Sequence, residues 1–220
     1  MNINKEKYKE ILAGLGDKVK LIAVSKTKSV EDIKALYDLG QRDFGENYVQ
    51  ELVDKYEALP NIHWHFIGHL QTNKVKYIAP FVSLIHGVDS FKLLKEVNKQ
   101  GEKNDRIINC LLQIHIAQEE TKFGLDEDEL DAIFGSAELK DLKNINISGM
   151  MGMASFTEDQ EIIRNEFRYL KTLFHSYKQL STGNCQLATL SMGMSADYKI
   201  AVEEGSNLVR IGSLIFGERN

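Results

Sequence analysis

Short apolar runs alternate with longer amphipathic stretches along the whole chain. The runs are rich in β-branched and aliphatic residues, which favour buried, pleated positions, and they predict strands. Eight strands are predicted, over residues 20–25, 42–46, 63–68, 83–88, 107–116, 146–151, 186–191 and 207–212. Residues 1–16 alternate charged and apolar residues at helical spacing, so an extra helix is expected before the first strand.

The stretches between the strands have a helical period. Residues 29–40 are typical, with Ser29 as the expected N-cap, Asp32 as its capping-box partner and Gly40 beyond the end of the helix. Residues 90–101 and 157–180 show the same apolar spacing.

Strands that alternate with helices indicate βαβ units and a parallel sheet. Eight such units close most economically into a (β/α)8 barrel of the α/β class, and an open doubly wound sheet is the alternative. No change of composition or linker interrupts the pattern, so residues 1–220 are expected to form a single domain.

Composition narrows the functional classes. The 220 residues are 43% hydrophobic and 27% charged, as expected for a soluble globular protein, and the net charge of −5 argues against a nucleic-acid-binding surface. Cys110 and Cys185 lie far apart in apolar runs, where core thiols of a reducing compartment are expected. No segment resembles a signal peptide or a membrane span, so the sequence predicts a cytoplasmic location.

Lys26 directly follows the first predicted strand. The chemistry of (β/α)8 barrels lies at the carboxyl ends of the strands, although a solvated loop lysine is the alternative interpretation. Lys28 competes for the role, but Ser29 as N-cap places Lys28 in the loop and leaves Lys26 closer to the barrel rim. A partly desolvated amine favours its neutral form, which attacks aldehydes. Lys26 is therefore a candidate for Schiff-base formation.

Two Gly- and Ser-containing turns follow the last two strands. Residues 189–195 and 209–217 each place these residues at the expected start of a helix, where backbone N–H groups bind anions. Either turn alone is also consistent with an ordinary cap. Because many barrels bind phosphate after strands 7 and 8, the two turns together with Lys26 predict a site for an aldehyde that carries a phosphate.

Other conspicuous residues favour structural roles. His63 and His65 share a strand face, but no cysteine or carboxylate accompanies them at ligand spacing, so packing is favoured and no metal site is predicted. His69 is a candidate for the pocket wall. The methionine run from Met150 predicts the inner barrel layer and part of the wall, and the acidic residues 125–131 predict a helix start rather than a calcium loop.

Several blocks together resemble one known family. They are LIAVSKTK, DFGENYVQE, HWHFIGHLQTNK and SMGMSADYKIAVEEGSNLVRIGSLIFG, which run in order from about residue 20 to 217 and are similar to the YggS/PROSC family of pyridoxal 5′-phosphate (PLP) homeostasis proteins. The resemblance implies the barrel of fold type III PLP enzymes. It also implies a set of cofactor-binding residues: Lys26, Asn47, Ser191, Gly193, Met194, Ser195, Arg210, Gly212 and Ser213.

Within that set, the resemblance gives Lys26 the Schiff base, Arg210 the pyridine nitrogen and Asn47 a place in the pocket wall. The six remaining residues of the set would contact the phosphate: Ser191, Gly193, Met194, Ser195, Gly212 and Ser213. The chain departs from the family where Ser29 replaces a common proline and where residues 149–153 read GMMGM. These departures are expected to alter loop stiffness and the pocket wall but not the covalent chemistry.

The implied function is that of a carrier or buffer in PLP (vitamin B6) homeostasis. A charged Arg210 would keep the ring nitrogen unprotonated and weaken the cofactor as an electron sink. Racemases of this fold type use a second β domain, which is not expected here because the chain ends soon after strand 8. Catalysis is therefore not expected. The expected partners are PLP-dependent apo-enzymes, and binding to nucleic acid or to a membrane is not expected. The alternatives are a vestigial racemase-like enzyme and a Schiff-base barrel enzyme for a phosphorylated aldehyde.

Overall fold

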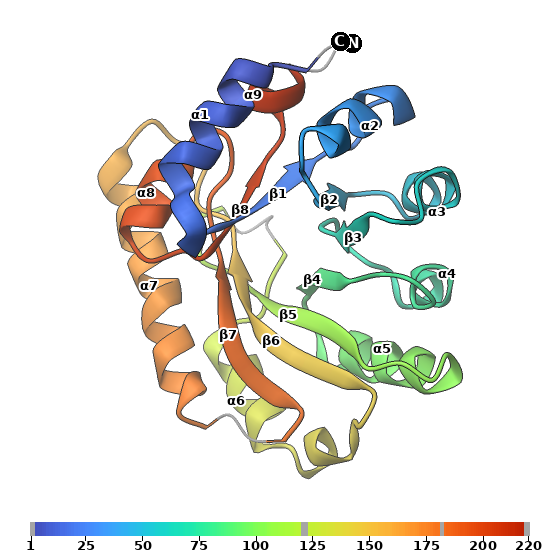
Figure 1. The fold of residues 1–220 in the computed structure, drawn as a ribbon. Helices are drawn as coiled ribbons and strands as arrows, with labels where there is room; N and C mark the ends of the chain where they lie inside the picture. Colours follow the sequence, from blue (N-terminus) through green and yellow to red (C-terminus); the bar gives the residue numbers. More distant parts are fainter. Residues whose placement is uncertain (1–2, 120–122, 181–182, 218–220) are drawn as a thin grey trace.

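Eight parallel strands form a closed barrel in chain order (Figure 1). The computed structural model describes residues 3–119, 123–180 and 183–217. β1 pairs with both β2 and β8, which closes the barrel and confirms the predicted (β/α)8 architecture. The strands are β1 Lys20–Val24, β2 Asp43–Glu46, β3 His63–Phe66, β4 Leu84–Val88, β5 Ile108–Ile114, β6 Ile145–Gly152, β7 Cys185–Ser191 and β8 Leu208–Ile211.

Helices surround the barrel on its outer side (Figure 1). They are α1 Lys5–Leu15, α2 Val30–Asp38, α3 Val49–Ala58, α4 Val75–Ile78, α5 Phe91–Lys103, α6 Glu127–Gly135, α7 Gln160–Lys178, α8 Tyr198–Glu203 and α9 Ser213–Phe216. The expected N-terminal helix is α1, which lies beside α9 and is joined to it by a hydrogen bond from the Asn4 N–H to the Ile215 carbonyl, at 2.7 Å. In the described part of the chain, no helix combines the length and the apolarity that crossing a bilayer requires.

Local signals fixed several helix ends as predicted. The Ser29 hydroxyl accepts the Asp32 N–H at the start of α2, and Asp126 and Glu129 form a capping box at the start of α6. Helix α5 instead passes through Gly101 and ends at Lys103. Glycine at position 101 serves packing and does not end the helix, because a Cβ there would lie 2.5 Å from the Asn144 carbonyl oxygen.

Buried apolar side chains form two clusters. The larger joins the strands to the surrounding helices, and the smaller consists of Ile22, Leu84, Leu111, Met151 and Leu208 from five strands. Because side chains alternate along a strand, Met151 belongs to the smaller cluster while its neighbour Met150 packs in the larger one. The prediction of an inner layer therefore holds for Met151 and was wrong for Met150.

Candidate functional site

A cavity of about 610 Å³ opens where the turns after several strands meet. It is lined by residues that lie at or follow the carboxyl ends of β1, β2, β3, β6, β7 and β8. Its walls are Val24, Lys26, Lys28, Asn47, Ile67, Met153, Ala154, Ser155, Phe156, Thr157, Ile163, Met194, Ser195, Ala196, Asp197, Arg210, Gly212, Ser213 and Gly217. The volume is of the size that small-molecule sites have, roughly 300–1,000 Å³.

Seven of the nine predicted binding residues line this cavity, and two do not. Ser191 and Gly193 are absent from the wall. Ser191 is fully buried at the end of β7, where its hydroxyl accepts a hydrogen bond from Arg210. Gly193 has φ +93°, and a Cβ there would lie 2.6 Å from the Ala201 Cβ, so glycine is needed for the turn itself.

Two lysines, Lys26 and Lys28, reach the cavity from the turn after β1. Both are partly buried. The Lys28 ammonium donates to the carbonyls of Phe216 and Gly217, at 3.1 and 3.4 Å, and so ties the turn to the end of α9. Lys26 lies closer to the strand, two residues after Val24. The geometry thus gives Lys28 an evident structural contact and places Lys26 at the rim that the sequence predicted.

Arg210 forms the positively charged floor of the cavity. Its guanidinium is 4% exposed and donates to the Ser191 hydroxyl at 2.5 Å and to the Gly152 carbonyl at 3.1 Å. Burial lowers the pKa of Arg210 to about 10, against the opposing effect of the Asp197 charge. The side chain therefore remains charged at neutral pH, and these contacts, with a third to the Ser191 carbonyl at 3.2 Å, set the orientation of the guanidinium plane.

The turns after β7 and β8 meet at one corner of the cavity. The Gly212 N–H donates to the Ser195 hydroxyl at 3.3 Å, and Ser213 begins α9. The Asp197 carboxylate accepts the Met194 N–H at 2.5 Å and holds the first turn in shape. Hydroxyls and backbone N–H groups thus gather at this corner, as the two sequence motifs predicted.

Asn47 follows β2 and lines the opposite wall. The Asn47 backbone packs closely against Gly68, which follows β3. A Cβ at Gly68 would lie only 2.3 Å from the Asn47 carbonyl oxygen. His69, the other candidate for the wall, is outside the lining. It pairs with Asp89 at 3.0 Å and stacks on Phe123 with a centroid distance of 4.4 Å.

Sequence reasoning placed part of the methionine run, which ends at Met153, in the cavity wall, but it missed residues 154–157 of the β6–α7 turn and Asp197. Residues 153–157 form a continuous part of the cavity wall, and Phe156 is 95% exposed at its rim. The position of these residues after β6 was the available signal, since every turn at this end of a barrel borders the same mouth.

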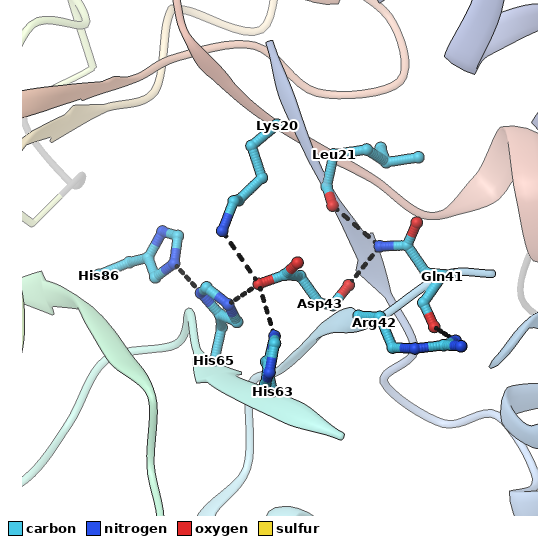
Figure 2. A network of polar contacts seen from close by, with 8 residues as sticks. All are labelled: Lys20, Leu21, Gln41, Arg42, Asp43, His63, His65 and His86. Carbon is cyan, nitrogen blue, oxygen red and sulfur yellow. Dashed lines mark hydrogen bonds and ion pairs between the residues drawn. The ribbon is translucent and has the colours of Figure 1, made fainter. Parts of the chain in front are cut away.

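The two histidines of β3 lie beside Asp43 and Lys20 (Figure 2), which are the first residues of β2 and β1, so this network is at the amino end of the barrel. His65 Nε2 lies 3.0 Å from Asp43 Oδ1, and His65 Nδ1 lies 3.0 Å from His86 Nε2. Lys20 and His63 also contact Asp43, at 3.4 and 3.6 Å. The carboxylate that the sequence spacing did not reveal is thus supplied by β2, but neither this cluster nor any other among residues 3–119, 123–180 and 183–217 has three such side chains arranged to hold a metal ion.

The tautomers of this histidine pair follow from the chain of contacts. An ionised Asp43 accepts the proton of His65 Nε2, so His65 Nδ1 must accept from His86 Nε2. His86 Nδ1 then remains a buried acceptor with no hydrogen-bond partner in the described residues. Burial lowers the pKa of both imidazoles, that of His86 strongly, so both are neutral at physiological pH. These contacts fit the packing role that the sequence favours for the histidines.

Comparison with known proteins finds one family over almost the entire chain. The model of the alanine racemase N-terminal domain matches residues 4–220. A protein of Aquifex aeolicus named pyridoxal phosphate homeostasis protein is 41% identical over 210 residues, which are 94% of this chain and 90% of that protein.

Solved structures agree with this result. PipY of Synechococcus elongatus PCC7942 is 32% identical, and each of its structures covers 96% of this chain and 99% of its own. The TM-scores are 0.90 without PLP and 0.87 with PLP bound. Alanine racemase of Clostridium difficile 630 shares the fold alone, with a TM-score of 0.76 at 16% identity, over 99% of this chain and 58% of the racemase.

Proposed function

Because this chain belongs to the family of pyridoxal phosphate homeostasis proteins, we propose that it captures PLP covalently on Lys26 and holds it for transfer to other proteins. The protein is a PLP-binding barrel that acts in PLP homeostasis. The observation that carries the proposal for the site is one cavity that joins the Lys26 turn to Arg210, Ser195 and Ser213.

The side chains around the cavity fit the chemical groups of PLP. When bound, PLP supplies an aldehyde that condenses reversibly with a primary amine. Lys26 offers that amine, and the hydroxyls of Ser195 and Ser213, on either side of Gly212, offer donors for a phosphate dianion. The apolar side chains of Val24 and Ile67 provide surface for a flat ring.

The remaining predicted residues take different roles in the proposal. Met194 and Gly212 would border the phosphate, since their N–H groups already donate to Asp197 and to Ser195, and Asn47 would border the ring. Ser191 and Gly193 lie outside the wall and would act indirectly, Ser191 by fixing Arg210 and Gly193 by shaping the turn.

Arg210 favours a carrier over an enzyme of amino-acid metabolism. A guanidinium facing the pyridine nitrogen would discourage protonation of that nitrogen, because the two positive charges would repel each other. PLP stabilises carbanions most strongly with a protonated ring nitrogen, so racemisation and transamination are disfavoured. We extend the proposal to PLP-dependent apo-enzymes as recipients, to action as a single domain and to a cytoplasmic location.

Two parallel assays test the carrier function. The PLP-loaded protein should reactivate a PLP-dependent apo-enzyme, while exchange of the α-proton of alanine or serine in deuterated water should remain far below the usual enzymatic range of about 1 per second or faster. Free PLP at the same concentration and the Lys26→Ala variant are the controls. Amino-acid turnover in the enzymatic range would contradict the carrier function, whatever the transfer assay shows.

A further inference from the structure

Both peptide groups of Lys26 are held by the same buried ion pair. The Ser25 carbonyl, which belongs to the peptide before Lys26, accepts from the Lys55 ammonium at 2.8 Å. The Thr27 N–H, which belongs to the peptide after Lys26, donates to Glu51 Oε1 at 2.5 Å. The backbone on either side of Lys26 is thereby fixed to helix α3.

The two holding groups are themselves joined. Lys55 and Glu51 lie one turn apart on α3, and their charged atoms are 2.6 Å apart. The Lys55 ammonium also contacts Glu46 Oε1 at 2.9 Å, and that oxygen accepts the Ser25 hydroxyl at 2.6 Å. We call Glu46, Glu51 and Lys55 the turn clamp. Two of its three charged groups are desolvated, since Glu46 is fully buried and Lys55 is 6% exposed, while the Glu51 side chain is 22% exposed.

The clamped turn has a strained backbone. Thr27 has φ +63°, a conformation that a β-branched residue rarely adopts. Such a conformation persists only where the surroundings enforce it, and strained residues concentrate at functional sites. The Glu51 carboxylate accepts the Thr27 N–H, and the Lys28 N–H donates to the Ser25 carbonyl at 3.0 Å, so both contacts hold the strained residue next to Lys26.

A purely structural network would not need this composition. A buried lysine shared by two carboxylates is a poor way to gain stability, because the desolvation of three charges offsets their attraction. The clamp does hold the turn in one orientation, since each of these hydrogen bonds joins a clamp residue to the turn or to another clamp residue. A nucleophile needs such fixed placement, because small displacements slow its reaction strongly.

We infer that Glu46, Glu51 and Lys55 are positioning residues that set the Lys26 amine for covalent capture of PLP. This inference rests on the proposed function. It predicts that disrupting the clamp impairs the covalent step and leaves the binding of ring and phosphate intact, because the clamp touches the turn from below and forms no part of the cavity wall.

Two ligands separate these steps. PLP carries the aldehyde, and pyridoxine 5′-phosphate has the same ring and phosphate with an alcohol in its place. Lys55→Met should slow covalent capture of PLP roughly tenfold or more, while the dissociation constant for pyridoxine 5′-phosphate should stay within about twofold of wild type. The capture rate is followed by absorbance, and the product is confirmed by borohydride trapping and peptide mapping.

A matched control is available on the neighbouring helix. Lys34 of α2 pairs with Asp38 at the same spacing, but both side chains are about 60% exposed. Lys34→Met should therefore leave both measurements unchanged. If Lys55→Met does not fold, Glu51→Ala gives the same test, because the Glu51 side chain is 22% exposed and tolerates truncation more easily.

The outcomes are distinguishable. Slower capture with retained pyridoxine 5′-phosphate binding supports the positioning role. Wild-type capture rates in the clamp variants, or equal loss of both ligands, would overturn that role and leave the proposed function standing. If the wild-type protein itself carried no label on Lys26, the proposed function would be wrong and the inference would be overturned with it.

Discussion

Strand β2 carries an acidic side chain at each end, and the two acids have opposite surroundings. At the amino end, Asp43 contacts His65 and Lys20 and is partly exposed (Figure 2). At the carboxyl end, Glu46 contacts Lys55 and Ser25 and is fully buried beneath the Lys26 turn. One strand thus carries a polar network at the amino end of the barrel and, at the carboxyl end, contacts that hold the turn of Lys26, the proposed covalent site.

The pKa values of the two acids reflect this difference. Burial opposes ionisation of Asp43, but the hydrogen bond from His65 and the nearby charges outweigh it, so the Asp43 pKa is lowered. At Glu46 burial outweighs Lys55 and Ser25 and raises the pKa to about 7. One acid is thus held firmly ionised, while the other has a pKa close to neutral pH.

The largest expected effect contrasts the two ends of β1. Lys26→Ala should abolish covalent capture of PLP, because the nucleophile is removed. Lys20→Ala is the matched control: Lys20 also lines a cavity, of about 460 Å³, but at the amino end of the barrel. Absorbance and borohydride trapping give the answer. Capture that survives in Lys26→Ala, or that disappears in Lys20→Ala, would reverse the assignment of the two ends.

A second expected effect concerns the corner of the cavity formed by Ser195, Gly212 and Ser213, which is the proposed phosphate site. Ser195→Asp and Ser213→Asp should weaken PLP binding by roughly 10- to 100-fold, because a carboxylate repels the phosphate dianion, while pyridoxal binding should change by less than about threefold. Ser176→Asp adds the same charge on the exposed face of α7 and serves as the control. Titration with each ligand measures the effect, and parallel loss of PLP and pyridoxal would show general disruption instead.

The sequence was sufficient for the elements of the barrel but not for these networks. Apolar runs predicted all eight strands, and Lys26, Ser195 and Ser213 could be placed at the mouth because the end of a strand fixes the end of the barrel. The clamp could not be predicted, since Glu46 and Lys55 meet only through the packing of α3 against β2.

Two contacts could not be read from the sequence, for the same physical reason. Asp43 is 22 residues from His65 and reaches it only through the pairing of β2 with β3, so ligand spacing within one segment did not reveal it. Ser191 belongs to the predicted phosphate motif, but it faces Arg210 and lies outside the cavity wall. Side-chain direction at the last residue of a strand depends on the neighbouring strands.

A third prediction separates stability from binding. Asp43→Ala removes the acceptor of the buried His65 N–H and should lower the free energy of unfolding by about 1–3 kcal/mol, with PLP capture unchanged. Asp38→Ala, which removes an exposed ion pair of α2, should cost about 0–1 kcal/mol. Chemical denaturation and the capture assay are run on the same samples. A loss of capture in Asp43→Ala would mean that the two ends are coupled.

The smallest effect is a difference in pH dependence. A raised Glu46 pKa means that its contribution to stability is present below about pH 4.5 and is lost as the pH rises through about 7. The lowered pKa of His86 acts in the opposite sense, because its contribution is present above about pH 6.5 and is lost as the pH falls.

Between pH 5 and 6.5, Glu46→Gln should therefore steepen the rise of unfolding free energy with pH, and His86→Leu should flatten it. Each change in slope should be at most about 1.4 kcal/mol per pH unit. Urea denaturation across this range measures the slopes. Slopes that shift in the same direction for both variants would contradict the opposite contributions of Glu46 and His86 to the pH dependence of stability.

Peptide mapping after borohydride reduction of the PLP-loaded wild-type protein tests the central claim most directly. We predict a single reduced PLP label, on the peptide that contains Lys26 and at Lys26 itself. A label on Lys28, on Lys20 or distributed among several lysines would contradict the account, because the covalent site would then not lie at the end of β1 that the clamp holds.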